Sequence, residues 1–253
     1  MTTETLDTTD SLLGGRVVLR QPASGFRVSV DAVLLAAAVV LEPGARALDV
    51  GCGTGGATLC LASRVADASL VGIDRDSKMT CGLRANVAAN GFDGRIVDEI
   101  VDIADGVPQR LRGAFDHVFS NPPYLPLGRA DVRELDERRH RAMIESVPLD
   151  AWLSFMAASC RPKGRITFVH RADRLDELLA VFSTLAGEIR VQPIWPRAGV
   201  SARRVIISGR VGVRAPTSLY PGLVLHDTGG GYTPAARRVI EDGAPLLFSD
   251  AVD

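Results

Sequence analysis

The sequence contains few cysteines, and their arrangement points to neither a disulfide framework nor a metal centre. Its 253 residues include four, Cys52, Cys60, Cys81 and Cys160, with no C-x-x-C pair and no histidines at zinc-ligand spacing. Scattered cysteines of this kind are typical of small buried side chains in a reducing compartment. The sequence therefore predicts no metal site and a cytoplasmic protein.

Long hydrophobic runs and an overall excess of charge are lacking as well. No apolar run approaches the roughly 20 residues that cross a bilayer, and the polar, acidic start Met1–Asp7 predicts no signal peptide. The formal net charge is −1, but residues 1–105 hold 9 basic and 14 acidic side chains, whereas residues 161–215 hold 11 and 4. The second stretch either forms a basic face that suits nucleic acid or consists of solvated arginines on surface helices.

What the sequence does contain is an alternation of short apolar runs with helical periodicity. A short strand is expected at 17–19, and a helix that Ser29 caps and that ends near Leu41. Further runs typical of strands occur at 45–50, 70–73, 96–101, 115–119, 165–169, 190–194 and 205–207, with helical patterns between them and a last helix capped by Thr233. The order predicts an α/β fold with a mostly parallel, doubly wound, seven-stranded sheet covered by helices on both faces. Residues 1–13 are expected to form a disordered tail and residues 14–253 one domain.

A glycine-rich turn follows the first of these seven strands. In Leu48–Gly56, the glycines Gly51, Gly53 and Gly55 allow the backbone to approach a ligand closely, and the following helix directs N–H groups towards it. Gly51, Gly53 and Gly56 also satisfy the G-x-G-x-x-G pattern of dinucleotide-binding dehydrogenases. The acid at Asp49 favours S-adenosylmethionine instead, because that cofactor has an ammonium group to hold and no pyrophosphate.

Two further acids follow the next two strands. Asp74 can accept hydrogen bonds from both hydroxyls of a ribose, since a carboxylate offers two oxygens to paired donors; the alternative is a cap for a helix that begins at Arg75. Asp102 is placed to accept from an adenine amino group, with Ile103 against the ring, or it is a plain turn residue.

The segment Ser120-Asn121-Pro122-Pro123-Tyr124 indicates the chemistry. Two prolines fix the backbone and remove two N–H donors, so the loop is stiff and its carbonyls point outward. If the Asn121 side-chain oxygen and the Pro122 carbonyl each accept one N–H, a planar amine is turned so that its lone pair faces a methyl donor. Tyr124 offers a ring that can stack on a planar substrate. The alternative is a proline turn after a core strand.

Taken together, these motifs resemble the class I, Rossmann-like amino-methyltransferases, and within them the bacterial tRNA1(Val) adenine-N6 methyltransferases. The resemblance extends over about residues 14–240 and includes the flanking segments Gln21–Ala36 and His226–Pro234. It implies that Asp49, Gly51, Gly53, Gly55, Asp74, Asp102, Ile103 and Asn121 contact S-adenosylmethionine, and that Asn121, Pro122, Pro123 and Tyr124 hold the target base. It further implies that the substrate is an RNA, namely tRNA.

The stretch Gly128–Arg141 departs from a simple basic loop. It carries five arginines and four interleaved acids, so it either grips RNA or forms an exposed helix with i,i+4 ion pairs. Other acceptors remain open: the glutamine of a protein, the guanine N2 of ribosomal RNA, or a small molecule. Only 48 residues precede Asp49, which argues against the helical domain expected of a glutamine methyltransferase. A nucleotide-binding module without catalysis is the other class of function.

Overall fold

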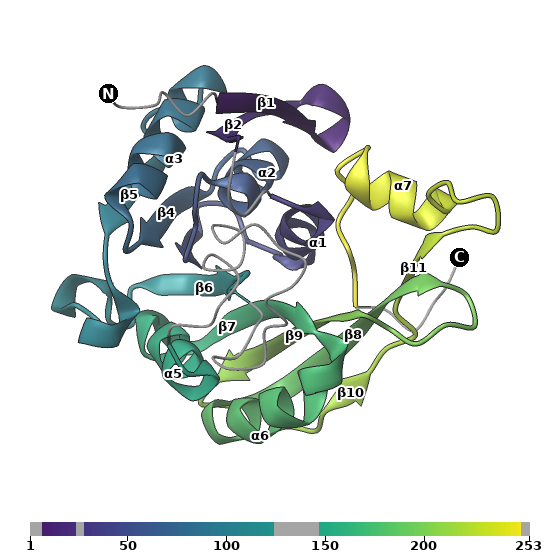
Figure 1. Cartoon of the computed structure of the whole chain (residues 1–253). Coiled ribbons are helices and arrows are strands. Elements are labelled where there is room, and N and C mark those ends of the chain that lie inside the picture. The colour runs from purple at the N-terminus through teal and green to yellow at the C-terminus, as the bar shows by residue number, and fades with distance from the viewer. Residues whose placement is uncertain (1–6, 24–27, 124–146, 249–253) are drawn as a thin grey trace, which may run out of the picture.

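The computed structural model describes residues 7–23, 28–123 and 147–248, and one large sheet forms its centre (Figure 1). Within these residues the sheet has nine strands, in the order β10-β8-β9-β7-β6-β3-β4-β5 with β11 also paired to β8. In chain order they are β3 (Arg46–Val50), β4 (Ser69–Asp74), β5 (Ile96–Ile100), β6 (Phe115–Ser120), β7 (Cys160–Arg171), β8 (Ala186–Arg197), β9 (Arg204–Val211), β10 (Ser218–Leu219) and β11 (Leu223–His226).

The predicted sheet is confirmed in its main strands. The seven predicted strands correspond to β3 to β9, and neighbours are parallel except where β9 lies antiparallel between β7 and β8. The strands β10 and β11 are additions at one edge, each parallel to β8. Runs of two and four residues are too short to show strand periodicity in a sequence.

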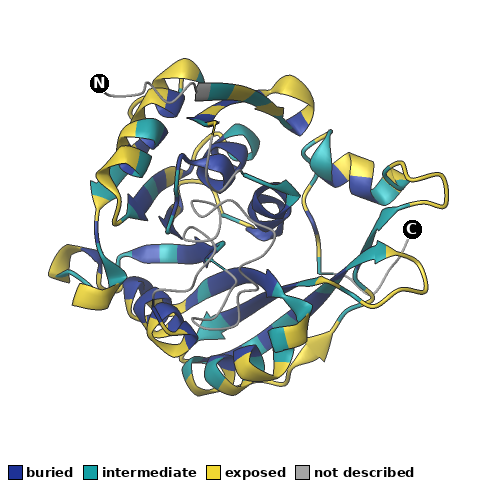
Figure 2. Ribbon diagram, viewed as in Figure 1, coloured by how far each residue is buried: buried dark blue, intermediate teal, exposed yellow. Residues whose placement is uncertain are grey.

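Helices cover both faces of the sheet. The helices α1 (Val30–Ala38), α2 (Gly56–Arg64), α3 (Ser77–Ala89) and α7 (Pro234–Ile240) contribute to one hydrophobic core, and α5 (Leu149–Ser159) and α6 (Leu175–Leu185) contribute to a second core. Short 3-10 turns are η1 (Leu13–Gly15), η2 (Ile103–Asp105), η3 (Gln109–Leu111) and η4 (Ala172–Arg174). Figure 2 shows the central strands and α1 as largely buried, as expected of a parallel sheet between two helical layers.

Two predicted helix starts are confirmed by their capping bonds. The Ser29 hydroxyl accepts from the Asp31 N–H at 3.3 Å, and the Thr233 hydroxyl accepts from the Ala236 N–H at 3.1 Å. The first helix ends earlier than predicted, at Ala38, because Val39 already has extended backbone angles. Of the apolar residues that follow, Val39 is buried but Val40 is 56% exposed, so this stretch is an extended connection rather than a last helical turn.

The disordered tail predicted for residues 1–13 is wrong for residues 7–12. These form β1 (Asp7–Leu12), which pairs antiparallel with β2 (Val17–Pro22) in a separate two-stranded sheet. The hairpin is held against α3 because the Asn86 and Asn90 side chains bond to β2 backbone groups at 2.7 to 2.9 Å. The polar sequence of β1 lacks strand patterning, so its order comes from pairing rather than from burial.

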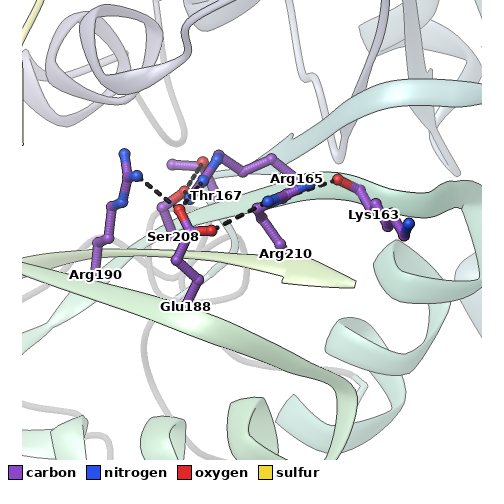
Figure 3. Close-up of polar contacts among 7 residues, drawn as sticks. All are labelled: Lys163, Arg165, Thr167, Glu188, Arg190, Ser208 and Arg210. Carbon is purple, nitrogen blue, oxygen red and sulfur yellow. Dashed lines mark hydrogen bonds and ion pairs between the residues drawn. The ribbon is translucent and has the colours of Figure 1, made fainter. Parts of the chain in front are cut away.

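A row of polar side chains crosses the sheet near the amino-terminal ends of its parallel strands (Figure 3). His117 bonds to Thr167 at 2.7 Å, and the Thr167 and Ser208 hydroxyls lie 2.9 Å apart. The row continues into what we call the Glu188 cluster, in which one carboxylate accepts from Arg165, Arg190 and Arg210 at 2.6 to 3.2 Å. This end of the sheet is opposite the site described next.

Candidate functional site

A cavity of about 330 Å³ lies at the carboxyl-terminal ends of β3, β4 and β6. Parallel α/β sheets bind ligands at this edge, where the strand order reverses. Of the residues predicted for the site, those that line the cavity are Asp49, Gly51, Gly53, Asp74, Asp102, Ile103, Asn121, Pro122 and Pro123. Gly55 does not line it, and Tyr124 lies outside the described residues. The predicted positions thus come together in space although they span more than 70 residues of sequence.

The glycine turn owes its shape to backbone angles that side chains disfavour. Gly51, Gly53 and Gly55 have φ values of 72°, 55° and 96°. A Cβ atom on Gly51 would lie 3.0 Å from the Trp152 ring, and one on Gly55 would lie 2.4 Å from Leu83. Gly55, the residue just before α2, therefore packs its backbone closely against Leu83 of α3 instead of facing the cavity.

Asp49 is a buried carboxylate at the floor of the cavity. Only 2% of its surface is exposed, and its Oδ2 atom accepts from the Thr58 hydroxyl at 2.6 Å. Burial raises the pKa of Asp49 to about 7, the Thr58 hydrogen bond opposes this shift, and the neighbouring Asp74 adds to it. Among the described residues Asp49 has no ion pair. An acid in this state gains most from a cationic ligand.

Asp74 holds the glycine turn as well as facing the cavity. Its Oδ2 atom accepts from the Gly53 N–H at 3.0 Å and its Oδ1 atom from the Asp76 N–H at 2.9 Å. The helix-cap alternative is wrong, because α3 is capped by Asp76, whose side chain accepts from the Lys78 N–H. Burial raises the pKa of Asp74, and the two backbone N–H groups act against this rise. Each carboxylate oxygen keeps a second lone pair for a ligand hydroxyl.

Asp102 is a turn residue that also lines the cavity. It caps η2, since its Oδ1 atom accepts from the Ala104 N–H at 2.9 Å, and it also lines the cavity beside Ile103. Val101 and Met79 complete the apolar part of this wall. A polar edge next to an apolar surface suits a flat heteroaromatic ring.

The end of β6 brings Asn121 into the same cavity. The Ser120 hydroxyl donates to the Val50 carbonyl at 2.6 Å and accepts from the Trp152 indole N–H at 2.9 Å. The three groups come from β3, β6 and α5, so they fix the start of the Asn-Pro-Pro segment relative to the glycine turn. The cavity therefore has a rigid wall on the side where Asn121 lies.

Sequence reasoning missed several residues of this cavity. Trp152 was predicted only as part of a helix, and Thr58 carried no signal for its bond to Asp49. Thr54 and Met79 were also not singled out, although each lines the cavity. The spacing of Asp49 and Thr58 across the glycine turn could have suggested that α2 directs a hydroxyl back at the strand end. The contact of Trp152 could not be foreseen, because α5 is placed by the packing of the sheet.

Metal ligands and membrane-spanning segments are both missing from the parts of the chain that the structure describes. No group of three or more His, Cys, Asp or Glu residues there could hold a metal ion, and no helix there is long and apolar enough to cross a bilayer. All four cysteines are free thiols. The arginine-rich stretch Gly128–Arg141 lies outside the described residues.

Comparisons with known proteins agree with this geometry. Residues 25–137 match the family model described as the methyltransferase small domain. A tRNA1(Val) (adenine(37)-N6)-methyltransferase of Porphyromonas gingivalis is 30% identical over 248 residues, which are 92% of this chain and 94% of the relative. The enzyme with the same name from Aeromonas salmonicida is 30% identical over 82% of this chain and 86% of its own length.

A solved structure supports the fold independently. A predicted O-methyltransferase from Agrobacterium tumefaciens superposes with a TM-score of 0.71 at 24% identity, covering 85% of this chain and 98% of its own. At this level of identity the likeness establishes the architecture alone. The two strands beyond the predicted seven therefore do not alter the class of fold.

Proposed function

This chain belongs to the S-adenosylmethionine-dependent methyltransferase family that includes the tRNA1(Val) (adenine(37)-N6)-methyltransferases, and we propose that it methylates the exocyclic N6 amine of an adenine in tRNA. The enzyme class and the cofactor predicted from the sequence are confirmed. The observation that carries the acceptor chemistry is the position of Asn121 and Pro122 on the wall of the cavity that also contains Asp49 and Asp74. An RNA acceptor also accords with the predicted cytoplasmic location.

The residues of the cavity fit S-adenosylmethionine. A volume of about 330 Å³ lies within the range of small-molecule sites. Asp49, whose pKa is raised by burial, would face the ammonium group, and Asp74 would accept from the ribose hydroxyls. Asp102 and Ile103 would take the adenine ring. When bound, S-adenosylmethionine supplies an activated methyl group, so the protein needs no strong base before attack.

Asn121 and Pro122 act on the acceptor. An exocyclic amine is a poor nucleophile because its lone pair is delocalised into the ring. Hydrogen bonds from its two N–H groups to the Asn121 amide oxygen and the Pro122 carbonyl turn the nitrogen and favour the geometry needed for attack. Ser120 and Trp152 hold this segment in place, through bonds of 2.6 and 2.9 Å. The protein thus contributes orientation and electrostatic stabilisation.

The test is the substitution Asn121→Ala. It should lower the rate of methyl transfer to tRNA by about 10²- to 10³-fold, because one oriented acceptor at the reacting nitrogen is lost. The affinity for S-adenosylmethionine, measured by calorimetry, should stay close to that of the wild type. Asn121→Asp keeps an acceptor oxygen and should retain partial activity, which separates this role from a purely structural one.

The acceptor is identified in the same assay. Labelled S-adenosylmethionine is incubated with total tRNA from cells that lack the gene, and the labelled nucleoside is identified after digestion. Incorporation into N6-methyladenosine supports the proposal. A parallel reaction contains the protein extract of the same cells, and label there but not in tRNA would point to a glutamine acceptor. An Asn121→Ala enzyme with near-normal turnover would mean that the segment is only a rigid turn.

A further inference from the structure

A second hollow lies further along the edge of the sheet that contains the cavity. It is an open groove of about 720 Å³, which we call the distal groove; among the residues that line it are Ala172, Leu175, Pro193, Trp195, Leu219 and Tyr220. Its walls are mostly apolar, and 71% of the Leu219 surface is exposed. None of these residues takes part in the cavity at the ends of β3, β4 and β6.

The distal groove and the cavity lie at the same edge of the sheet. Strand β8 runs parallel to β6 and is three positions away from it in the order β6-β7-β9-β8. At a spacing of about 4.8 Å per strand, the two strands are about 14 Å apart. The register places Arg171 of β7 opposite Arg204 of β9, which in turn pairs with Ile194 of β8, one residue before Trp195. A nucleic-acid strand a few nucleotides long can bridge this separation.

The aromatic side chains of the groove are fixed in place. The Trp195 indole N–H donates to the Pro221 carbonyl at 3.0 Å, and the Tyr220 ring packs edge-on against Phe248. A Cβ atom on Gly222, whose φ is 91°, would lie 2.4 Å from the Pro193 carbonyl oxygen and 2.6 Å from the Trp195 nitrogen. The turn can therefore approach the indole only with glycine here. Rings held in this way lose little conformational freedom when a base stacks on them.

The charge around the groove is positive. Residues 189–226 contain six arginines and no aspartate or glutamate. Arg204 is paired with Asp31 at 2.9 Å, whereas the exposed Arg197 and Arg203 have no ion pair among the residues that the structure describes. Arg197 ends β8 directly after the groove, and Arg203 precedes β9, where its carbonyl accepts from the Ala172 N–H at 3.1 Å. Two unneutralised cations therefore border an aromatic groove.

We propose that the distal groove binds an unpaired nucleotide of the RNA substrate, with its base on Trp195 and its phosphates beside Arg197 and Arg203. This inference rests on the proposed function. Single-stranded nucleic acid combines flat bases that stack on aromatic rings with phosphates that require arginine, which is the combination present here. An apolar protein segment would use Trp195 and Leu219 but would leave the arginines unmatched. The target base would enter the cavity while a neighbouring nucleotide lies in the groove.

The experiment measures RNA binding separately from chemistry. The dissociation constant for in vitro transcribed tRNA, and KM and kcat for methylation of tRNA from cells that lack the gene, are compared between wild type and variants. Trp195→Ala should raise both the dissociation constant and KM about tenfold, with kcat little changed, because one stacked base is lost. Trp195→Phe keeps an aromatic face and should recover most of the affinity.

Substitution of the two arginines should change how RNA affinity depends on salt concentration. Arg197→Ala and Arg203→Ala should each lower the slope of log affinity against log salt by about 1. The matched control is Arg112→Ala, an exposed arginine without an ion pair among the described residues, located just before β6 at the opposite edge of the sheet. It should change neither the slope nor KM. Melting temperature and S-adenosylmethionine affinity are measured for every variant to confirm that each is folded.

The outcomes separate this inference from the function on which it rests. If the wild type methylates tRNA but Trp195→Ala and the arginine variants keep its dissociation constant and salt slope, the groove serves another ligand, such as a protein segment, and the proposal is overturned. If the wild type methylates no RNA at all while still binding S-adenosylmethionine, the proposed function fails together with this inference. A selective loss of RNA affinity in the variants supports both.

Discussion

The carboxylates of Asp49 and Glu188 lie at opposite ends of the parallel strands and are partly or wholly buried, but among the described residues only Glu188 is paired with cations of the protein. At the carboxyl-terminal edge, Asp49 is 2% exposed and its strongest partner is a neutral hydroxyl, so burial raises its pKa to about 7. At the other edge, Glu188 is surrounded by Arg165, Arg190 and Arg210. Burial alone would raise the pKa of Glu188, but the hydrogen bonds from Arg165 and Arg210 lower it below its usual value.

The difference distinguishes a binding site from a structural contact. A carboxylate whose charge is matched within the fold stabilises the native state. A buried carboxylate without a cation destabilises it and persists where a ligand provides the missing charge. By this criterion we propose that Asp49 binds the ammonium group of the cofactor, whereas the Glu188 cluster joins strands β7, β8 and β9. Three substitutions test the contrast.

The largest effect is expected for Asp49→Asn, which removes the negative charge and keeps the size of the side chain. The affinity for S-adenosylmethionine should fall by about 3 kcal/mol, or roughly 100-fold, because the ligand ammonium loses its buried partner. Calorimetry at pH 8 measures this loss. Asp116→Asn makes the same change near the amino-terminal end of β6, where Asp116 pairs with Arg161, and should leave the affinity unchanged.

The raised pKa of Asp49 also predicts how the stability of the protein and its affinity for the cofactor change with pH. The folded-state pKa of Asp49, about 7, lies above the ordinary value of 3.8, so between these values the folded state binds more protons than the unfolded state. The free energy of unfolding of the ligand-free protein should therefore fall as pH rises from 4 to 7. Binding of a cation favours the ionised form, so cofactor affinity should rise with pH up to about 7 and then level off. Asp49→Asn should flatten this rise, and an unchanged pH profile would remove Asp49 from the site.

The second effect is expected for Asp74→Ala. It removes a two-point contact with a ribose, worth about 2–3 kcal/mol if both charge-assisted bonds form. It also removes the acceptor of the Gly53 N–H at 3.0 Å, which should lower the melting temperature slightly. Calorimetry that showed an unchanged affinity would exclude Asp74 from cofactor binding. Binding of NAD more tightly than S-adenosylmethionine would instead support a dehydrogenase.

These tests concern residues that the sequence already identified, because their signals are local. The glycines, the acid before them and the acid after the next strand stand at spacings set by a single strand-turn-helix unit. The caps at Ser29 and Thr233 are equally local, since each side chain bonds two or three residues ahead. Periodicity likewise gave the seven main strands, because buried parallel strands are continuous apolar runs.

What the sequence did not predict depends on contacts between distant segments. Trp152 bonds to Ser120 across 32 residues, and its position follows only from the packing of α5 against the sheet. The strand β1 is polar, and its pairing with β2 is supported by α3, whose asparagines are about 70 residues away. The Glu188 cluster joins β7, β8 and β9, whose order in the sheet, β8-β9-β7, differs from their order in the chain. No period or spacing in the chain encodes such contacts.

The smallest effect is expected for Glu188→Gln, and it concerns stability. Without ligand, this variant should be less stable than the wild type, whereas Asp49→Asn should be more stable. Glu188 and its arginines are between 20% and 37% exposed, so solvent weakens their attraction. Loss of the carboxylate should lower the free energy of unfolding at pH 7 by about 1–2 kcal/mol and less in high salt. Since the pKa of Glu188 is lowered on folding from its ordinary value of 4.5, the difference should shrink as pH falls below 4.5 and vanish once the carboxyl is protonated in the folded state as well.

The control makes the same substitution at an exposed pair. Glu241→Gln breaks the contact of Glu241 with Arg237 at 3.4 Å, in which both side chains are about half exposed, and should cost less than about 0.5 kcal/mol. Chemical denaturation of the three variants at pH 8 without cofactor decides the comparison. Asp49→Asn should be more stable than the wild type, Glu188→Gln less stable and Glu241→Gln nearly unchanged, whereas only Asp49→Asn should lose cofactor affinity. If Asp49→Asn were destabilised as Glu188→Gln is, the buried acid would be a structural residue like Glu188, and the cation of the ligand would have to be held elsewhere in the cavity.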